Sequence, residues 1–152
     1  MTQVSTNKRT ALFPGTFNPF TAGHADIARR GLAIFDELII GVGINASKPK
    51  ADAEAVLEPI RRLFAGEPRI RVEAYSGLTV DAARQFGATA LLRGVRSAKD
   101  YDYERDMADI NHQLSGIESV ILFSKPELGA ISSSVVRELQ AYGVDTSAFL
   151  PK

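Results

Sequence analysis

The sequence predicts an α/β fold, with a single-domain, doubly wound sheet of five parallel strands. The first observation is that short apolar runs alternate along the chain with segments that have helical periodicity. The second is that most of these runs are apolar at consecutive positions, as in strands that are covered on both faces. The third is the length of 152 residues, which suits one domain over residues 1–152 whose first ten, residues 1–10, form a polar tail.

The first strand and the first helix enclose a segment rich in turn-forming residues. The run "ALF" predicts a strand at 11–13, and a helix is expected at about 23–35. The apolar face of this helix consists of Ile27, Gly31, Ile34 and Phe35. The run "ELIIGVGI" then predicts the second strand at 37–44.

The second and third helices lie on either side of the third strand, "RIRVEAY" at 69–75. Pro59 is expected in the first turn of the second helix, where the missing backbone N–H costs no hydrogen bond. The apolar positions of the second helix are Ile60, Leu63 and Phe64. Those of the third helix are Val80, Ala83 and Phe86.

The last part of the chain repeats the same alternation. "TALLR" at 89–93 and "SVILFS" at 119–124 predict the fourth and fifth strands. A helix at about 100–115 is marked by Tyr103, Met107, Ile110 and Leu114. The final helix is marked by Val135, Val136 and Leu139 and opens with serines that can cap its N-terminus.

Composition excludes several classes of function. Lys and Arg together number 18, as do Asp and Glu, so no bulk positive charge exists to hold a nucleic-acid polymer. The absence of cysteine excludes disulfides and thiolate metal sites, and two histidines make a protein-built metal site improbable. Without an 18-residue apolar run or a signal-peptide core, no membrane association is expected, and the chain is predicted to be cytoplasmic.

The stretch "FPGTFNPFTAGH", residues 13–24, joins the first strand to the first helix. Gly15 lets the backbone approach a ligand closely, and Thr16 and Phe17 add N–H groups. His24 falls in the first helical turn, where free N–H groups favour an anion. The stretch therefore predicts a phosphate cradle that is neither a Walker A loop nor a dinucleotide fingerprint. The alternative is a turn-rich loop whose histidine only caps the helix.

A second predicted anion site opens the last helix, in "ISSSVVRE" at 131–138. Its three serines supply hydroxyl and N–H groups at a helix N-terminus, and Arg137 lies one turn later. The alternative is an ordinary helix cap with redundant serines.

Cationic side chains follow two other predicted strands. Arg93 and Arg96 flank Gly94 and could hold two phosphate groups, with Glu104 on the helix that follows. Lys48 follows the second strand in "NASKPK". Ligands in open α/β sheets bind at this end of the strands, although each cation could instead be a solvated surface residue.

Together these segments resemble a known family. "TAGH" at 21–24 and "ISSSVVR" at 131–137 are similar to the (H/T)xGH and ISSTxxR motifs with which nucleotidylyltransferases grip a nucleoside triphosphate. The GTFxPxTxGH opening, and RGxR followed by a D(F/Y)xYE segment, make the chain similar to bacterial phosphopantetheine adenylyltransferases from about residue 11 to 150. The resemblance implies a Rossmann-like nucleotidylyltransferase fold.

The resemblance also implies an activity and its partners. AMP would pass from ATP to 4′-phosphopantetheine, giving dephospho-coenzyme A and pyrophosphate, with Mg²⁺ as cofactor. A homohexamer and feedback inhibition by coenzyme A are implied as well. The alternatives are a related nucleotidylyltransferase with another phosphate acceptor, such as nicotinamide mononucleotide or glycerol phosphate, and a non-catalytic nucleotide-sensing module.

Site residues follow from the resemblance position by position, and none is expected to bind a metal. The residues expected to act in catalysis are His24, Thr16 and Lys48. Those expected to bind phosphopantetheine are Thr16, Lys48, Thr79 and Arg93. Those expected to bind ATP are Thr16, Phe17, His24, Gly94, Val95, Arg96, Glu104, Leu128, Gly129, Ala130, Ile131, Ser132, Ser133 and Ser134.

The expected mechanism is direct in-line attack by the acceptor phosphate, because a phosphate monoester needs no strong general base. His24 would donate to the α-phosphoryl group, and Arg96 with the serines would hold the departing pyrophosphate. The chain departs from the family pattern at Gly77, Leu128, the 51–62 segment and the short C-terminus. These departures concern substrate contacts more than the transfer itself.

Overall fold

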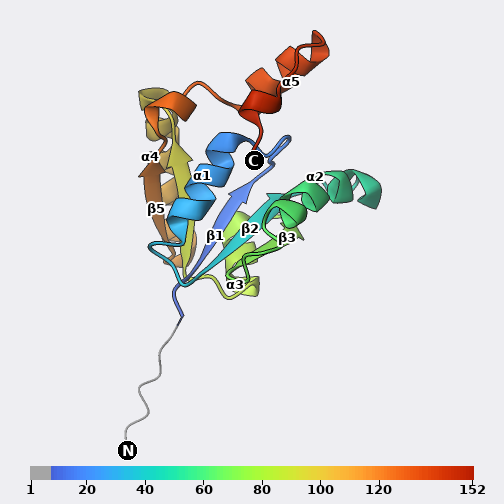
Figure 1. The fold of residues 1–152 in the computed structure, drawn as a ribbon. Helices are drawn as coiled ribbons and strands as arrows, with labels where there is room; N and C mark the ends of the chain where they lie inside the picture. Colours follow the sequence, from blue (N-terminus) through green and yellow to red (C-terminus); the bar gives the residue numbers. More distant parts are fainter. Residues whose placement is uncertain (1–7) are drawn as a thin grey trace, which may run out of the picture.

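A computed structural model describes residues 8–152 and contains one five-stranded parallel sheet, which confirms the predicted fold class (Figure 1). The strand order is β3-β2-β1-β4-β5. The strands are β1 (Thr10–Gly15), β2 (Glu37–Gly43), β3 (Ile70–Tyr75), β4 (Ala90–Val95) and β5 (Glu118–Phe123). Of the predicted tail, residues 1–7 lie outside the described residues, whereas Thr10 is buried at the start of β1.

Helices cover both faces of this sheet, as a doubly wound fold requires. They are α1 (Ala22–Gly31), α2 (Lys50–Leu63), α3 (Thr79–Gln85), α4 (Ala98–Ser115) and α5 (Ser133–Ala141), with 3₁₀ turns at Pro126–Leu128 and Ser147–Phe149. The helices α1 and α2 pack on one face and α3 on the other, where α4 lies beside it. Within residues 8–152, no helix combines the length and apolar character needed to cross a membrane.

Consecutive residues of each central strand enter different cores, which explains the continuous apolar runs. Phe13 packs toward α1 and α2, whereas its neighbour Leu12 packs toward α3. In β2, Ile40 and Ile39 divide in the same way. Each of these side chains is at most 3% exposed, so the strands are stabilised by apolar burial on both sides.

The prediction for Pro59 is wrong. The helix α2 begins at Lys50, so Pro59 lies in its interior rather than in its first turn. The preceding segment "KADAEAVLE" is rich in strong helix formers, and Leu57 and Ile60 are at most 2% exposed. The burial of this helical face and the propensity of the earlier turns outweigh the cost of one proline.

The apolar positions of α4 have the predicted spacing but do not face a core in this chain. Tyr103, Ile110 and Leu114 are between 47% and 62% exposed. The buried residue of α4 is instead Glu104. Periodicity identified the helix correctly, whereas the face that packs inward follows from where the helix meets the sheet.

The sheet has a topological switch point between β1 and β4. These strands are neighbours, and the connection from β1 leads to β2 while that from β4 leads to β5 on the opposite side. Such a point leaves a crevice at the carboxyl ends of the two strands, where ligands bind in open α/β sheets.

Candidate active site

A cavity of about 320 Å³ lies at the carboxyl ends of β1 and β4. Most of its lining comes from three segments that are distant in sequence: the β1–α1 loop with the start of α1, the end of β4 with the start of α4, and the start of α5. The predicted site residues among its lining are Thr16, Phe17, His24, Arg93, Gly94, Arg96, Glu104, Ile131, Ser132, Ser133 and Ser134. The structure therefore brings the early histidine and the late serines to one cavity.

His24 is held by a reciprocal cap at the start of α1. The Thr21 backbone N–H donates to His24 Nδ1 over 3.0 Å, and the His24 N–H donates to Thr21 Oγ1 over 3.3 Å. Because a backbone N–H can only donate, Nδ1 must accept, and the proton of the neutral ring lies on Nε2. The helix-capping alternative and the proton-donor role are therefore compatible.

The ring of His24 is uncharged at neutral pH. Burial, followed by the positive charges of Arg93 and Arg96, lowers its pKa from 6.5 to about 4. The rings of Phe17 and Phe20 lie 5.0 and 5.4 Å from it, centroid to centroid. His24 therefore offers a neutral N–H donor to the cavity.

The tight β1–α1 loop depends on one glycine. A Cβ at Gly15 would lie 2.8 Å from the Phe17 ring, a contact too short for any other residue to make without rearrangement. Phe17 has a φ of 48°, which is uncommon for a residue other than glycine. Gly15 thus allows the loop to fold back over the end of β1.

The start of α5 is fixed to this loop. Ser132 Oγ accepts from the Val135 N–H over 3.1 Å, which makes Ser132 the N-cap. Ser133 Oγ donates to the Pro19 carbonyl over 2.7 Å. Arg137 donates to the Asn18 carbonyl and to Ser134 Oγ, and it does not line the cavity.

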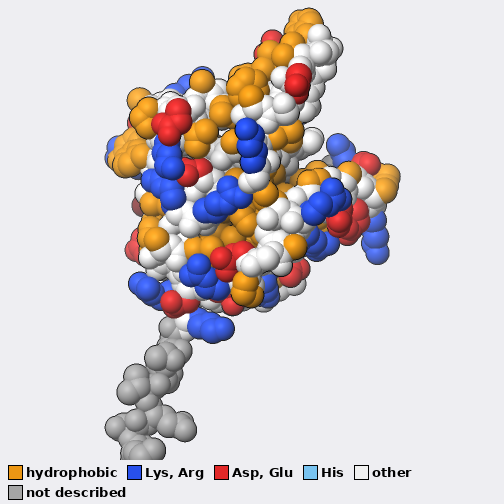
Figure 2. All heavy atoms as spheres, viewed as in Figure 1, with side chains coloured by type: hydrophobic (Ala, Val, Ile, Leu, Met, Phe, Trp, Pro, Cys, Tyr) orange, Lys and Arg blue, Asp and Glu red, His pale blue; other side chains and the backbone are white. Residues whose placement is uncertain are grey.

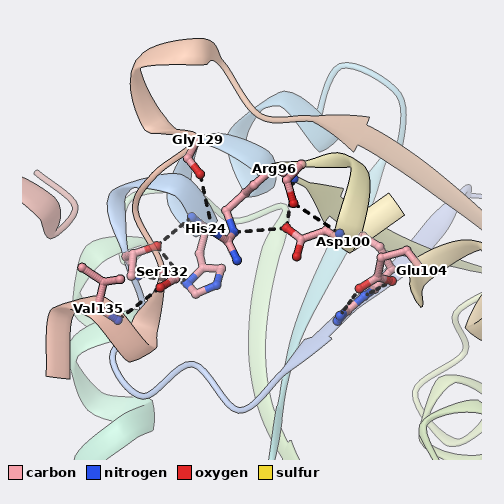
Figure 3. A network of polar contacts seen from close by, with 10 residues as sticks. His24, Arg96, Asp100, Glu104, Gly129, Ser132 and Val135 are labelled. Carbon is pink, nitrogen blue, oxygen red and sulfur yellow. Dashed lines mark hydrogen bonds and ion pairs between the residues drawn. The ribbon is translucent and has the colours of Figure 1, made fainter. Parts of the chain in front are cut away.

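Arg96 closes the other side of the cavity (Figure 3). Its Nε lies 3.3 Å from Asp100 Oδ2, and its Nη1 donates to the Gly129 carbonyl over 3.4 Å. Sequence reasoning missed Asp100, which also lines the cavity. The four-residue spacing between Arg96 and Asp100 was the signal that could have identified it.

A second cavity, of about 190 Å³, adjoins the first. Thr79, predicted to bind phosphopantetheine, lines it and bonds to the Tyr75 hydroxyl, the two oxygens being 3.0 Å apart. Tyr75 and Asn111 also line it and were not predicted. The residues that line both cavities are Pro14, Gly15, Thr16, Arg93 and Glu104.

Five predicted residues line neither of these cavities. Lys48 is exposed in the turn after β2, where its N–H donates to the Asn45 carbonyl over 3.0 Å. Val95 is buried in the sheet. The others are Leu128, Gly129 and Ala130, in the connection between β5 and α5.

In the described residues, no cluster of three or more His, Cys, Asp or Glu side chains is arranged to hold a metal ion. The two carboxylates of the first cavity, Asp100 and Glu104, are paired with Arg96 and Arg93. With His24 neutral, the charged side chains of this cavity balance.

Comparison with known proteins gives close relatives. A family model described as cytidylyltransferase-like matches residues 12–139. The chain is 56% identical over 146 residues to the phosphopantetheine adenylyltransferase of Porphyromonas gingivalis, covering 95% of each chain. It is 50% identical over 145 residues to that of Bacteroides fragilis, covering 95% of this chain and 97% of the relative.

Solved structures with the same fold are more distant in sequence. A bifunctional NMN adenylyltransferase/ADP ribose pyrophosphatase from Francisella tularensis aligns with a TM-score of 0.68 at 14% identity. The match covers 95% of this chain and 45% of that one. This likeness shows a shared nucleotidylyltransferase-like fold.

Proposed function

The chain belongs to the phosphopantetheine adenylyltransferases, within the cytidylyltransferase-like family, and we propose a mechanism for their reaction in its two cavities. The family and enzyme class predicted from the sequence are thereby confirmed. The activity is the transfer of AMP from ATP to 4′-phosphopantetheine, a step of coenzyme A biosynthesis. The mechanism that we propose is direct in-line attack where the cavities meet.

One observation carries this mechanism: the two cavities share a wall that includes Thr16 and Arg93. ATP would occupy the larger cavity, lined by His24 and the start of α5. Phosphopantetheine would occupy the smaller one, beside Thr79. The acceptor phosphate and the α-phosphorus would then meet at the shared wall, as an in-line displacement requires.

Each group at the wall has a proposed task. The Nε2–H of His24 donates to the α-phosphoryl oxygens as negative charge develops on them. Arg96 and the free N–H groups at the start of α5 hold the departing pyrophosphate. Thr16 orients the acceptor phosphate, and Lys48 joins it only if the turn after β2 moves toward the cavity.

Magnesium fits this cavity as a companion of ATP rather than as a protein-held ion. The cavity's two carboxylates are paired with its two arginines, so its charged side chains sum to zero. The side chains would therefore leave the negative charge of a bound triphosphate unneutralised. Mg²⁺ commonly binds through substrate phosphates and water, and there it supplies charge neutralisation. The proposed cofactor therefore enters with the nucleotide.

Self-association is proposed from exposed apolar side chains. Figure 2 shows hydrophobic side chains along the projecting α5. In this helix Val135 is 42% exposed, and Tyr142, which caps its C-terminus, is 79% exposed. The exposed apolar side chains of α4, Tyr103, Ile110 and Leu114, form a second such surface. Together the two surfaces support a homo-oligomer, which we propose to be a hexamer. Coenzyme A is proposed as an inhibitor and the cytoplasm as the location, with no nucleic-acid polymer or membrane as partner.

The test is one assay with several acceptors. Purified protein is given Mg-ATP and 4′-phosphopantetheine, nicotinamide mononucleotide or glycerol phosphate, and pyrophosphate release is measured. Release with phosphopantetheine alone is expected. Release with another acceptor would identify a related transferase, and ATP binding without release for any acceptor would identify a nucleotide sensor.

The assignment of the two cavities has its own test. Thr79 lines only the smaller cavity, so Thr79→Ala is expected to weaken phosphopantetheine binding more than ATP binding, which separate titrations of the two substrates would show. The opposite result would mean that the substrates occupy the cavities in the reverse order.

A further inference from the structure

Glu104 is a buried carboxylate beside two proposed phosphate sites. It is 7% exposed and is the only charged side chain buried within residues 8–152. Figure 3 shows it on the side of the cavity that Asp100 also borders. Burying a carboxylate is costly unless a partner compensates its charge, and neighbouring phosphates would repel it. Its position therefore depends on its partner.

That partner is Arg93, through a two-point ion pair. Arg93 Nη2 lies 2.6 Å from Glu104 Oε1, and Arg93 Nε lies 2.8 Å from Oε2. This parallel geometry is the strongest form of the arginine–carboxylate interaction. Arg93 Nη1 also donates to the Pro14 carbonyl, at the end of β1. The guanidinium is thus held from α4 and from β1 at once.

Arg93 keeps two N–H groups that are not used by Glu104 or by the Pro14 carbonyl. A guanidinium has five N–H groups, and three are used by Glu104 and Pro14, which leaves one on each terminal nitrogen. Arg93 lines both cavities. One fixed cation therefore borders both proposed phosphate positions.

We propose that Glu104 is a positioning residue that acts through Arg93, holding its guanidinium between the cavities so that the free N–H groups bind the reacting phosphates of both substrates. This inference rests on the proposed function and is an alternative to the expectation that Glu104 itself binds ATP. The ion pair has no net charge, so Arg93 contributes directed hydrogen bonds rather than long-range attraction. Such bonds depend on placement, which the carboxylate provides.

A double-mutant cycle tests the dependence on Arg93. The wild type, Glu104→Gln, Arg93→Ala and the double variant are compared by kcat and by KM for each substrate. Glu104→Gln keeps the side-chain size but loses the charge, and it is expected to lower kcat/KM for both substrates by about 10- to 100-fold. In the Arg93→Ala background the same change is expected to cause no further loss.

Two outcomes would overturn the proposal. One is a rise in KM for ATP alone, by the same factor with and without Arg93, which would indicate direct nucleotide contact. The other is unchanged kinetics in Glu104→Gln. Asp106→Asn is the matched control, because Asp106 is exposed on the same helix, lines neither cavity and should leave the kinetics unchanged. A wild type without turnover would count against the proposed function instead.

A spectroscopic measurement keeps the test independent of the Arg93→Ala variant, which leaves a buried carboxylate unpaired. In the wild type, the Arg93 guanidinium is expected to give separate ¹H–¹⁵N signals, because two-point pairing hinders its rotation. Glu104→Gln should average these signals while the melting temperature still reports a folded protein. Averaged signals in the wild type would contradict the fixed geometry.

Discussion

At the scale of single residues, the backbone decides the chemistry of His24. The Thr21 N–H bonds to Nδ1, so the proton available to substrate lies on Nε2. The ring stays neutral because of its burial and the nearby arginines. A neutral donor can stabilise developing negative charge without first binding the ground-state phosphates as a cation, which places its effect mainly in the transition state.

His24→Ala is therefore expected to lower kcat by about two orders of magnitude or more, as loss of one such donor typically does. The affinity for ATP should change less. Steady-state kinetics with a direct ATP titration measures both quantities. His112→Ala is the matched control, since His112 is exposed at the far end of α4 and should leave turnover unchanged. Near-normal turnover in His24→Ala would refute the donor role.

The lowered pKa of His24 also predicts a pH dependence of stability. The folded pKa is about 4 and the ordinary value is 6.5, so between these pH values the unfolded chain binds more protons than the folded one. The free energy of unfolding should therefore decrease as the pH falls from 6.5 toward 4, because the folded protein resists protonation of His24. Urea unfolding at pH 7 and pH 5 should show a smaller loss in His24→Ala than in the wild type. Equal losses in the two proteins would contradict the shift.

At the scale of elements, the N-terminus of α5 has both a structural and a proposed functional role. Ser132 caps the helix, while Ser133 ties it to the β1–α1 loop. The same turn that presents free N–H groups to the cavity is thus positioned by contacts with residues more than 100 positions earlier in the chain.

Ser132→Ala should lower the free energy of unfolding by about 1 kcal/mol and raise KM for ATP, because the cap and the cavity share this turn. Denaturant unfolding and steady-state kinetics measure the two effects. Ser115→Ala provides the comparison: its hydroxyl bonds to the backbone at the C-terminal end of α4, away from the larger cavity, so stability should fall while KM for ATP stays unchanged. A rise in KM for ATP of the same size in both variants would show that the effect is indirect.

At the scale of the whole molecule, adjacent cavities require both substrates to be bound together. Initial-velocity plots should therefore intersect, and the configuration at the α-phosphorus should invert in a single displacement. Chirally labelled ATP gives the stereochemical result. Retention of configuration, or parallel plots, would indicate an adenylylated enzyme and exclude direct transfer.

Much of this molecule follows from local sequence patterns. Every end of the five strands lies within two residues of its predicted bound, because residues buried on both faces form unbroken apolar runs. The motifs around His24 and Ser132 were also readable, since each places its groups on adjacent residues of one loop and helix turn.

Other features depend on contacts between distant segments. Three features follow from how helices, strands and loops pack together, which the periodicity of the sequence does not reveal. They are the exposure of the apolar side chains of α4, the interior position of Pro59 in α2 and the exposed position of Lys48. The pairing of Arg93 with Glu104 and with the Pro14 carbonyl joins three elements. No spacing rule indicates it, because the chain between Pro14 and Arg93 must first fold.

The sequence by itself therefore determined the fold class, the family and the chemical groups available at the carboxyl ends of the strands. Only the tertiary structure decided which of these groups share a cavity, which tautomer His24 adopts and which cations are already paired. The physical reason is the separation along the chain of the residues that interact. Helical and strand patterns arise from neighbours along the chain. Burial and pairing of charged groups depend instead on residues that are distant in sequence and come together only when the chain folds.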